Sequence, residues 1–249
     1  GKIYQKLNKY QEAMASYQKV IQIDSNYIKA HNNLGRIFQD MGKFSEAMSC
    51  YQQAIKLNPE YAEAHYNLGC VLERFGKMKE ALLSYTQAIQ YKLNYRKALH
   101  NLGRAQLAIN DYKNGWIGHE LRKGGTQKTY KSLGIIDKKI WNGRKFNGSL
   151  IVHGEQGIGD EILYSSMFSD LENYHEDLTI TVDERLISIM QRSFPKINFI
   201  SRNKKILSSK IDSSRHILAG SLGRIFRNSL NDFKNNKHSW LAPNPRKCT

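Results

Sequence analysis

The sequence has few of the residues that build disulfide frameworks, metal sites or membrane spans. Its 249 residues include three cysteines, Cys50, Cys70 and Cys248, which are widely separated and form no CxxC spacing. This pattern argues against a disulfide framework and a zinc site, so we expect no metal, no cofactor and a reducing, cytoplasmic compartment. The sequence also lacks a run of about 20 apolar residues that could cross a membrane.

The sequence has fewer acidic residues, 22, than basic ones, 38, and the formal net charge is +16. Basic and acidic residues number 17 and 10 over residues 1–122, 7 and 1 over 123–148, 3 and 9 over 149–200, and 11 and 2 over 201–249. The basic excess is therefore spread along the chain and interrupted by one acidic region. This spread favours a compositional bias over a dedicated polyanion surface, and nucleic-acid binding remains the weaker alternative.

A 34-residue period governs the first half of the chain. Residues 28–61 align with 62–95 and then, more loosely, with 96–122. In the first full copy the repeated positions are Ala30, Leu34, Gly35, Phe38, Gly42, Ala47, Tyr51, Ala54 and Pro59. This pattern resembles the tetratricopeptide repeat, in which two helices joined by a short turn stack on the next pair. It predicts an α-solenoid.

The same register continues backwards to the first residue. Gly1 pairs with Gly35, and Tyr17 pairs with Tyr51, so the first repeat lacks the opening turns of its first helix. There is also no initiator methionine and no secretory leader. We therefore expect the chain to be a fragment of a longer repeat array.

One asparagine recurs in each Asn-Leu-Gly triplet, as Asn33, Asn67 and Asn101. A ladder of amides along the first helices could hold the backbone of an extended polypeptide without reading its sequence. The repeats of protein O-GlcNAc transferases use such a ladder, and this resemblance implies a peptide groove. The alternative is that these amides form hydrogen bonds within the solenoid.

The period is lost after residue 122. Residues 123–148 are rich in glycine and lysine and are expected to form a basic linker, with Trp141 packing partly on the repeats. From residue 149 short β-branched runs alternate with helical patterns, which predicts strands near 149–156, 177–184, 197–202 and 215–220. Residues 157–174 read as one helix. The expected domains are thus the solenoid 1–122, the linker 123–148 and an incomplete Rossmann-like domain 149–249 with a parallel sheet.

A glycine-rich turn, residues 154–160, joins the first of these strands to its helix. Its sequence GEQGIGD matches neither the dinucleotide fingerprint nor the P-loop. Glu155, Asp160 and Glu161 surround the helix N-terminus, and residues 146–184 contain no lysine or arginine. A phosphate would be repelled there, whereas a carboxylate facing a crevice is suited to accept the proton of an acceptor hydroxyl.

The segments GWIGHELR, IWNG and LIVHGEQGIGDEILYSSMF resemble bacterial tetratricopeptide proteins fused to a glycosyltransferase-like domain, related to O-GlcNAc transferases and heptosyltransferases. The resemblance implies the N-terminal half of a two-domain GT-B fold. It also implies a catalytic base at Asp160, because heptosyltransferases place a Gly-Asp pair after the first strand. The substrate-binding candidates around this base are His153, Glu155, Gln156, Gly157 and Gly159. Asp160 could instead be a helix N-cap, and His153 an ordinary strand residue.

That family holds its nucleotide-sugar donor mainly in a second Rossmann domain, for which no sequence is left before Thr249. The leading interpretation is therefore a fragment of a repeat-containing glycosyltransferase. Its repeats would bind a polypeptide, its α/β half would hold the acceptor side of the site, and the fragment alone would be inactive. The alternative is a protein-interaction scaffold with a degenerate, non-catalytic transferase-like domain.

Overall fold

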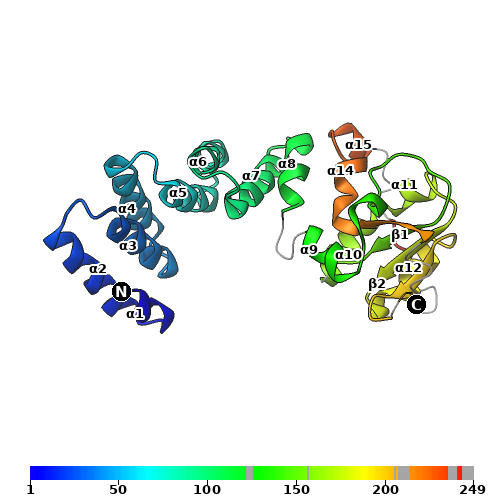
Figure 1. The fold of residues 1–249 in the computed structure, drawn as a ribbon, viewed down its shortest axis with the longest axis horizontal. Coiled ribbons are helices and arrows are strands. Elements are labelled where there is room, and N and C mark those ends of the chain that lie inside the picture. The colour runs from blue at the N-terminus through cyan, green and yellow to red at the C-terminus, as the bar shows by residue number, and fades with distance from the viewer. Residues whose placement is uncertain (122–125, 156, 205, 207–212, 235–239, 243–249) are drawn as a thin grey trace. The chain divides into compact units, whose positions relative to one another are not determined.

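The computed structural model describes residues 1–121, 126–155, 157–204, 206, 213–234 and 240–242. The chain divides into two compact units, residues 1–109 and residues 110–249, drawn in Figure 1. Each unit has its own core and is described by itself.

The first unit consists of antiparallel helix pairs, as the 34-residue period predicts. Its elements are α1 (Lys2–Lys6), α2 (Tyr10–Ile23), α3 (Ile28–Asp40), α4 (Phe44–Leu57), α5 (Ala62–Arg74), α6 (Met78–Tyr91) and α7 (Arg96–Ala108). The predicted helical solenoid is thus confirmed in this part of the chain. Helix α1 is short, and by the 34-residue register it is equivalent to the second half of α3.

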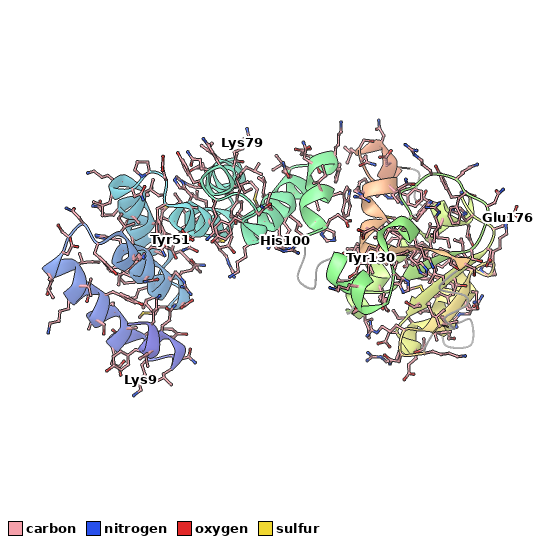
Figure 2. The ribbon with its side chains drawn as sticks, in the orientation of Figure 1. Lys9, Tyr51, Lys79, His100, Tyr130 and Glu176 are labelled. Atoms are coloured by element: carbon pink, nitrogen blue, oxygen red, sulfur yellow. The ribbon has the colours of Figure 1, made fainter. Side chains whose placement is uncertain are left out.

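Large rings packed on glycines hold each helix pair together. Tyr51 and Tyr85 are fully buried, and a Cβ atom added at Gly35 or Gly69 would overlap their rings. Figure 2 marks Tyr51 within its repeat. The Tyr51 hydroxyl donates a hydrogen bond to Gln39 at 2.8 Å. Small and large residues therefore alternate so that two helices approach closely and the ring fills the seam between them.

The turn inside each pair needs a left-handed backbone conformation. Gly42 and Gly76 have φ of +75° and +70°, and Asn110 has φ of +66° at the equivalent position. Asparagine is among the few residues that adopt this conformation readily. The replacement of the turn glycine by Asn110 therefore leaves the turn geometry unchanged.

The second unit contains a sheet and a larger set of short helices. Its elements are α8 (Tyr112–His119), α9 (Thr126–Ser132), η1 (Asp137–Lys139), β1 (Leu150–His153), α10 (Ile158–Ser165), α11 (Phe168–Glu172), β2 (Leu178–Val182), α12 (Glu184–Ser193), β3 (Asn198–Ser201), β4 (Arg215–Leu218), η2 (Ala219–Ser221), α14 (Gly223–Phe226) and α15 (Asn231–Lys234).

The four strands form one parallel sheet in the order β3-β2-β1-β4. All residues of β1 and β2 are buried, which is typical of central strands in a parallel sheet. The chain runs outward from β1 to β3 and then returns to the other side of β1 to form β4. The predicted parallel α/β arrangement is present in this part of the chain.

Residues 157–174 form two helices where one was predicted. Helix α10 ends at Ser165 and α11 begins at Phe168. The hydroxyls of Ser165 and Ser166 donate hydrogen bonds to the carbonyls of Ile162 and Leu163. These side chains compete with the backbone ladder, which favours an interruption at this point.

The boundary between the units differs from the expected one at residue 122. Helix α8 lies in the second unit, where Trp116 donates its Nε1–H to the carbonyl of Arg227 on the C-terminal side of α14. The repeat pattern gives the physical reason for this shift of the boundary. His119 occupies the position that Tyr51 and Tyr85 occupy in the two preceding repeats. Without the tyrosine that fills the seam, α8 is packed through its tryptophan.

The expected linker also contributes to the fold of the second unit. Tyr130 of α9, marked in Figure 2, accepts a hydrogen bond from the backbone N–H of Leu218 at 2.9 Å. Ile140 forms a parallel bridge to His216, which extends the sheet beside β4. Trp141 is buried in the core of the sheet, and this corrects the expectation that it packs on the repeats.

Candidate functional site

The candidate site lies at the carboxyl edge of the sheet, where the turn after β1 faces the segment after β4. This turn begins at Gly154, whose N–H donates a hydrogen bond to Thr181 Oγ1 at 2.9 Å. A Cβ atom at Gly154 would overlap the carbonyl oxygen of Thr181. Only glycine therefore lets the turn pass this close to the end of β2.

Asp160 lies in the first turn of α10 and is exposed. The N-cap of this helix is Gly157, and Asp160 stands three residues further on, so the capping alternative for Asp160 is wrong. Within the described part of the chain no hydrogen bond or ion pair engages its carboxylate. A Cβ atom at Gly159 would meet open space, so the backbone beside Asp160 is accessible.

Glu155 connects the two sides of this edge. Its Oε1 accepts a hydrogen bond from the N–H of Gly220 at 3.1 Å, which ties the turn after β1 to η2. Its carbonyl oxygen accepts a second bond from Arg202. Glu155 thus holds the turn in place, and its role in substrate binding stays a prediction.

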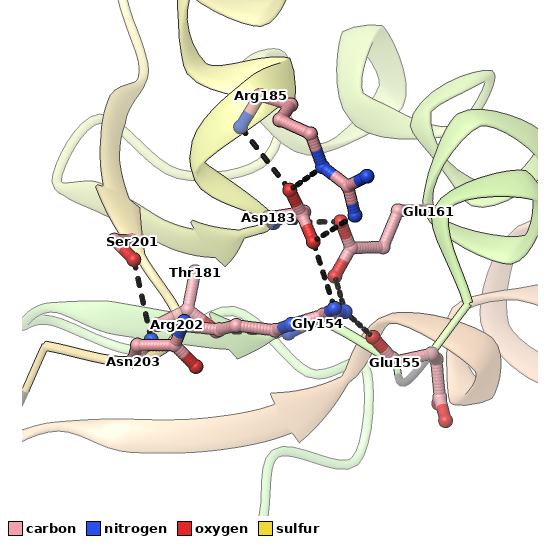
Figure 3. Close-up of polar contacts among 9 residues, drawn as sticks. All are labelled: Gly154, Glu155, Glu161, Thr181, Asp183, Arg185, Ser201, Arg202 and Asn203. Atoms are coloured by element: carbon pink, nitrogen blue, oxygen red, sulfur yellow. Dashed lines mark hydrogen bonds and ion pairs between the residues drawn. The ribbon is translucent and has the colours of Figure 1, made fainter.

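A network of charged side chains lies at the carboxyl ends of β1, β2 and β3, as Figure 3 shows. Glu161 is 1% exposed and forms an ion pair with Arg202 at 2.8 Å, while its second oxygen accepts the N–H of Asp183 at 2.8 Å. Arg202 also reaches Asp183 at 2.9 Å. Burial raises the pKa of Glu161, and the bonds from Asp183 and Arg202 oppose this shift.

Asp183 has a second basic partner. Its side chain caps α12 through the N–H of Arg185 and accepts the Arg185 Nε–H at 2.8 Å. The Arg185 side chain, followed by its backbone N–H, lowers the pKa of Asp183 to about 2. Two carboxylates and two guanidinium groups therefore neutralise one another at this edge.

His153 is the last residue of β1, and its side chain contacts His216 of β4. Its Nε2 lies 3.0 Å from Nδ1 of His216, and the two rings are stacked. Both side chains are buried. Burial, and then the neighbouring His216, lower the pKa of His153 to about 4, so His153 is neutral near pH 7.

Helix α8 adds polar groups near the same edge. His119 Nε2 lies 3.1 Å from the hydroxyl of Tyr164, which follows Asp160 by one turn on α10. Glu120 accepts a hydrogen bond from Ser221 of η2 at 3.1 Å. His119 and Glu120 therefore contact α10 and η2, the two elements that border the turn.

Sequence reasoning missed three contributors to this edge, Arg202, Asp183 and His216. A usable signal was present for Arg202 and Asp183, because each lies at the carboxyl end of a predicted strand and parallel strands end at the same edge. The predicted substrate residue Gln156 lies outside the described residues. Among the residues that the structure describes, no group of three histidine, cysteine or acidic side chains could hold a metal ion.

The asparagines of the three Asn-Leu-Gly triplets, Asn33, Asn67 and Asn101, are half-buried. Asn67 donates a hydrogen bond to Asn32 of the preceding repeat at 2.9 Å. Asn101 donates longer bonds, both 3.4 Å, to Cys70 and to the hydroxyl of Tyr85. Two of the three amides therefore have partners inside the repeats, as the alternative for these residues expected.

Comparison with known proteins identifies the repeats. Family models described as TPR repeat and tetratricopeptide repeat match residues 1–42, 35–76 and 62–95. The N-terminal part of the chain therefore consists of tetratricopeptide repeats, the class of helical repeats that mediates contacts between proteins.

Among curated proteins, FlbA of Caulobacter vibrioides is 30% identical over 95 residues, which is 36% of this chain and 16% of that protein. Among solved structures, the first TPR domain of Spaghetti (RPAP3), bound to an HSP90 peptide, is 27% identical with a TM-score of 0.43, over 44% of this chain and 86% of that one. YrrB, a TPR protein with an unusual peptide-binding site, is 20% identical with a TM-score of 0.44, over 53% and 71%.

Across the described ranges, no helix is both long enough and apolar enough to cross a bilayer.

Proposed function

We propose that this chain carries the acceptor half of a glycosyltransferase site, with repeats that bind the polypeptide to be modified. One observation carries the proposal. Of the three carboxylates around the turn, Glu155 and Glu161 are held by hydrogen bonds, whereas Asp160 is exposed in the first turn of α10. Asp160 is therefore the carboxylate available to an incoming hydroxyl.

The topology supports this location. The order β3-β2-β1-β4 is that of the first four strands in doubly wound folds, which bind ligands where the strand order reverses. The reversal lies between β1 and β4, and Glu155 spans it through Gly220. A Rossmann-like half of a GT-B fold, with the nucleotide-sugar donor held by a second α/β domain, is part of the proposal.

The reaction assigns a simple role to Asp160. Its carboxylate accepts the proton of the acceptor hydroxyl while that oxygen forms its bond to the anomeric carbon, and the bond to the nucleoside diphosphate breaks. General-base catalysis of this kind contributes roughly 10²- to 10⁴-fold in rate.

The test compares Asp160→Asn with the wild type in a homologue that has both halves of the transferase fold. Sugar transfer from nucleotide-sugar donors to polypeptide is measured together with the melting temperature. We expect turnover to fall roughly 10²- to 10⁴-fold, with little change in melting temperature because Gly157 is the N-cap. Glu184→Gln, which neutralises an exposed first-turn carboxylate on α12, is the matched control.

Retained turnover in Asp160→Asn would overturn the catalytic assignment. Absence of sugar transfer in the wild type itself would favour the alternative in which this unit is a non-catalytic scaffold.

A further inference from the structure

A pocket opens at the amino ends of the strands, on the edge of the sheet opposite the candidate site. Its volume is about 260 Å³. The residues that line it are Lys139, Phe146, Asn147, Ser213, Ser214 and Arg215. They come from the basic segment before β1 and from the entry to β4, whose first residue is Arg215. Neither segment has a role in the function proposed above.

The pocket lies in a basic part of the unit. Residues 137–149 and 212–215 together carry five basic and two acidic side chains. Lys139 and Arg215 bring two of these cations to the pocket wall. An anion entering the pocket therefore gains charge-assisted hydrogen bonds, which are stronger than neutral ones.

Ser214 supplies an independent indication of a ligand. It is 4% exposed, and within the described part of the chain its buried Oγ has no hydrogen-bond partner. Buried hydroxyls in folded proteins are nearly always paired, because an unpaired one loses its hydrogen bonds to water without compensation. A group bound in the pocket would provide the partner that the described residues do not.

Phe146 adds an apolar wall. The Arg215 guanidinium lies 5.3 Å from the centre of its ring, and the ring of His175 lies 4.5 Å away. Arg215 is thus held over the aromatic face at the pocket, and its fork of donors is suited to the oxygens of a phosphate. The volume accommodates a phosphate group with a small attached moiety.

We propose that this pocket binds a small phosphomonoester. The phosphate oxygens accept hydrogen bonds from Lys139, Arg215 and the unpaired hydroxyl of Ser214. The amide of Asn147 and the ring of Phe146 contact the group that carries the phosphate. This site is independent of Asp160 and of the transfer reaction proposed for the opposite edge.

The experiment is a calorimetric titration of the whole chain with inorganic phosphate, glycerol 3-phosphate and glucose 6-phosphate, with glucose as the unphosphorylated control. We expect saturable binding of the phosphorylated probes at one site. Arg215→Gln and Lys139→Gln should each weaken it at least about tenfold. Lys145→Gln removes an equal charge from a lysine that lies over Tyr174, outside the pocket lining, and should change affinity less than about twofold.

Ser214→Ala separates a ligand role from mere burial. If Oγ contacts the phosphate, this variant binds the probes several-fold more weakly while its melting temperature stays the same or rises, because an unpaired buried hydroxyl has been removed. Unchanged affinity with a raised melting temperature would overturn the proposal. Equal weakening by Lys145→Gln would also overturn it, as would no saturable binding at about 10 mM probe, since either result indicates diffuse attraction or none.

Discussion

At the scale of single residues, the candidate site is set by which carboxylates find a basic partner. Arg202 lies beyond the stretch 146–184 that lacks lysine and arginine, yet it is the group that pairs with Glu161 and Asp183. Arg202 therefore offsets part of the negative charge around the turn. Asp160 differs from the other carboxylates of the turn because its side chain is exposed.

The buried histidine pair leads to a prediction about pH. The pKa of His153 in the folded chain is about 4, below its usual 6.5, so the unfolded chain binds a proton that the folded chain does not between these values. The free energy of unfolding of the second unit should therefore fall as pH drops through this window. The loss attributable to His153 is about 2 kcal/mol between pH 7 and pH 5.

Urea unfolding followed by tryptophan fluorescence measures this loss. All three tryptophans, Trp116, Trp141 and Trp240, lie in the second unit, so the signal reports that unit alone. His153→Gln should flatten the pH dependence, whereas His31→Gln in the first unit should leave it unchanged. An equally steep pH dependence in His153→Gln would contradict the assignment.

At the scale of elements, the solenoid helices present amides that serve two competing purposes. Asn67 is joined to Asn32 of the preceding repeat, whereas within the described contacts Asn33 has no hydrogen bond. The first amide is thus committed to packing between repeats, and the second is available to a bound chain.

This difference allows the peptide groove to be tested with two single variants. If the amides hold an extended polypeptide, Asn33→Ala should weaken capture of a reduced, carboxymethylated and permanently unfolded polypeptide by several-fold without changing the melting temperature. Loss of one amide hydrogen bond is worth about 1 kcal/mol. Fluorescence anisotropy and thermal unfolding are the measurements.

Asn67→Ala serves as the comparison. It should lower the stability of the solenoid by about 1 kcal/mol, because the bond to Asn32 is lost. If Asn33→Ala leaves the affinity unchanged while Asn67→Ala is destabilising, the amides are structural and the groove hypothesis is wrong.

At the scale of the whole molecule, the position of α8 decides where one folding unit ends and the next begins. The indole ring of Trp116 packs against Gly223, and its Nε1–H donates a hydrogen bond to the carbonyl oxygen of Arg227. Glu120, directly after α8, accepts a hydrogen bond from Ser221. A helix that continues the repeat register is therefore part of the α/β unit.

Trp116→Ala should destabilise the second unit and leave the solenoid unaffected. The half-buried indole supports about 2 kcal/mol of the free energy of unfolding, somewhat less than a fully buried tryptophan. Ile117→Ala, a truncation of a side chain that is 61% exposed on the same helix, should change it by less than about 0.5 kcal/mol.

The remaining tryptophans report the second unit in both variants. Circular dichroism at the helical band follows the helices of both units, so a dichroism transition that is absent from the fluorescence reports the solenoid. A loss of solenoid stability in Trp116→Ala, with the fluorescence transition unchanged, would place α8 with the repeats.

The sequence by itself determined the repeats and the strands, because both arise from short-range patterns. The 34-residue spacing of small and aromatic residues identified the helix pairs, and β-branched runs located β1, β2, β3 and β4. The left-handed turn at Asn110 shows how local this information is. An asparagine there serves as well as Gly42, since only the backbone conformation is required.

Tertiary structure alone decided which distant residues meet. The pairing of Glu161 with Arg202, the contact of His153 with His216 and the docking of Trp116 on Gly223 depend on strand order and helix packing. A one-dimensional pattern specifies which face of an element is apolar but not the partner that will cover it. For that reason the helical repeats and the parallel α/β arrangement followed from the sequence, while the charge of the site and the limits of the units followed only from the packed chain.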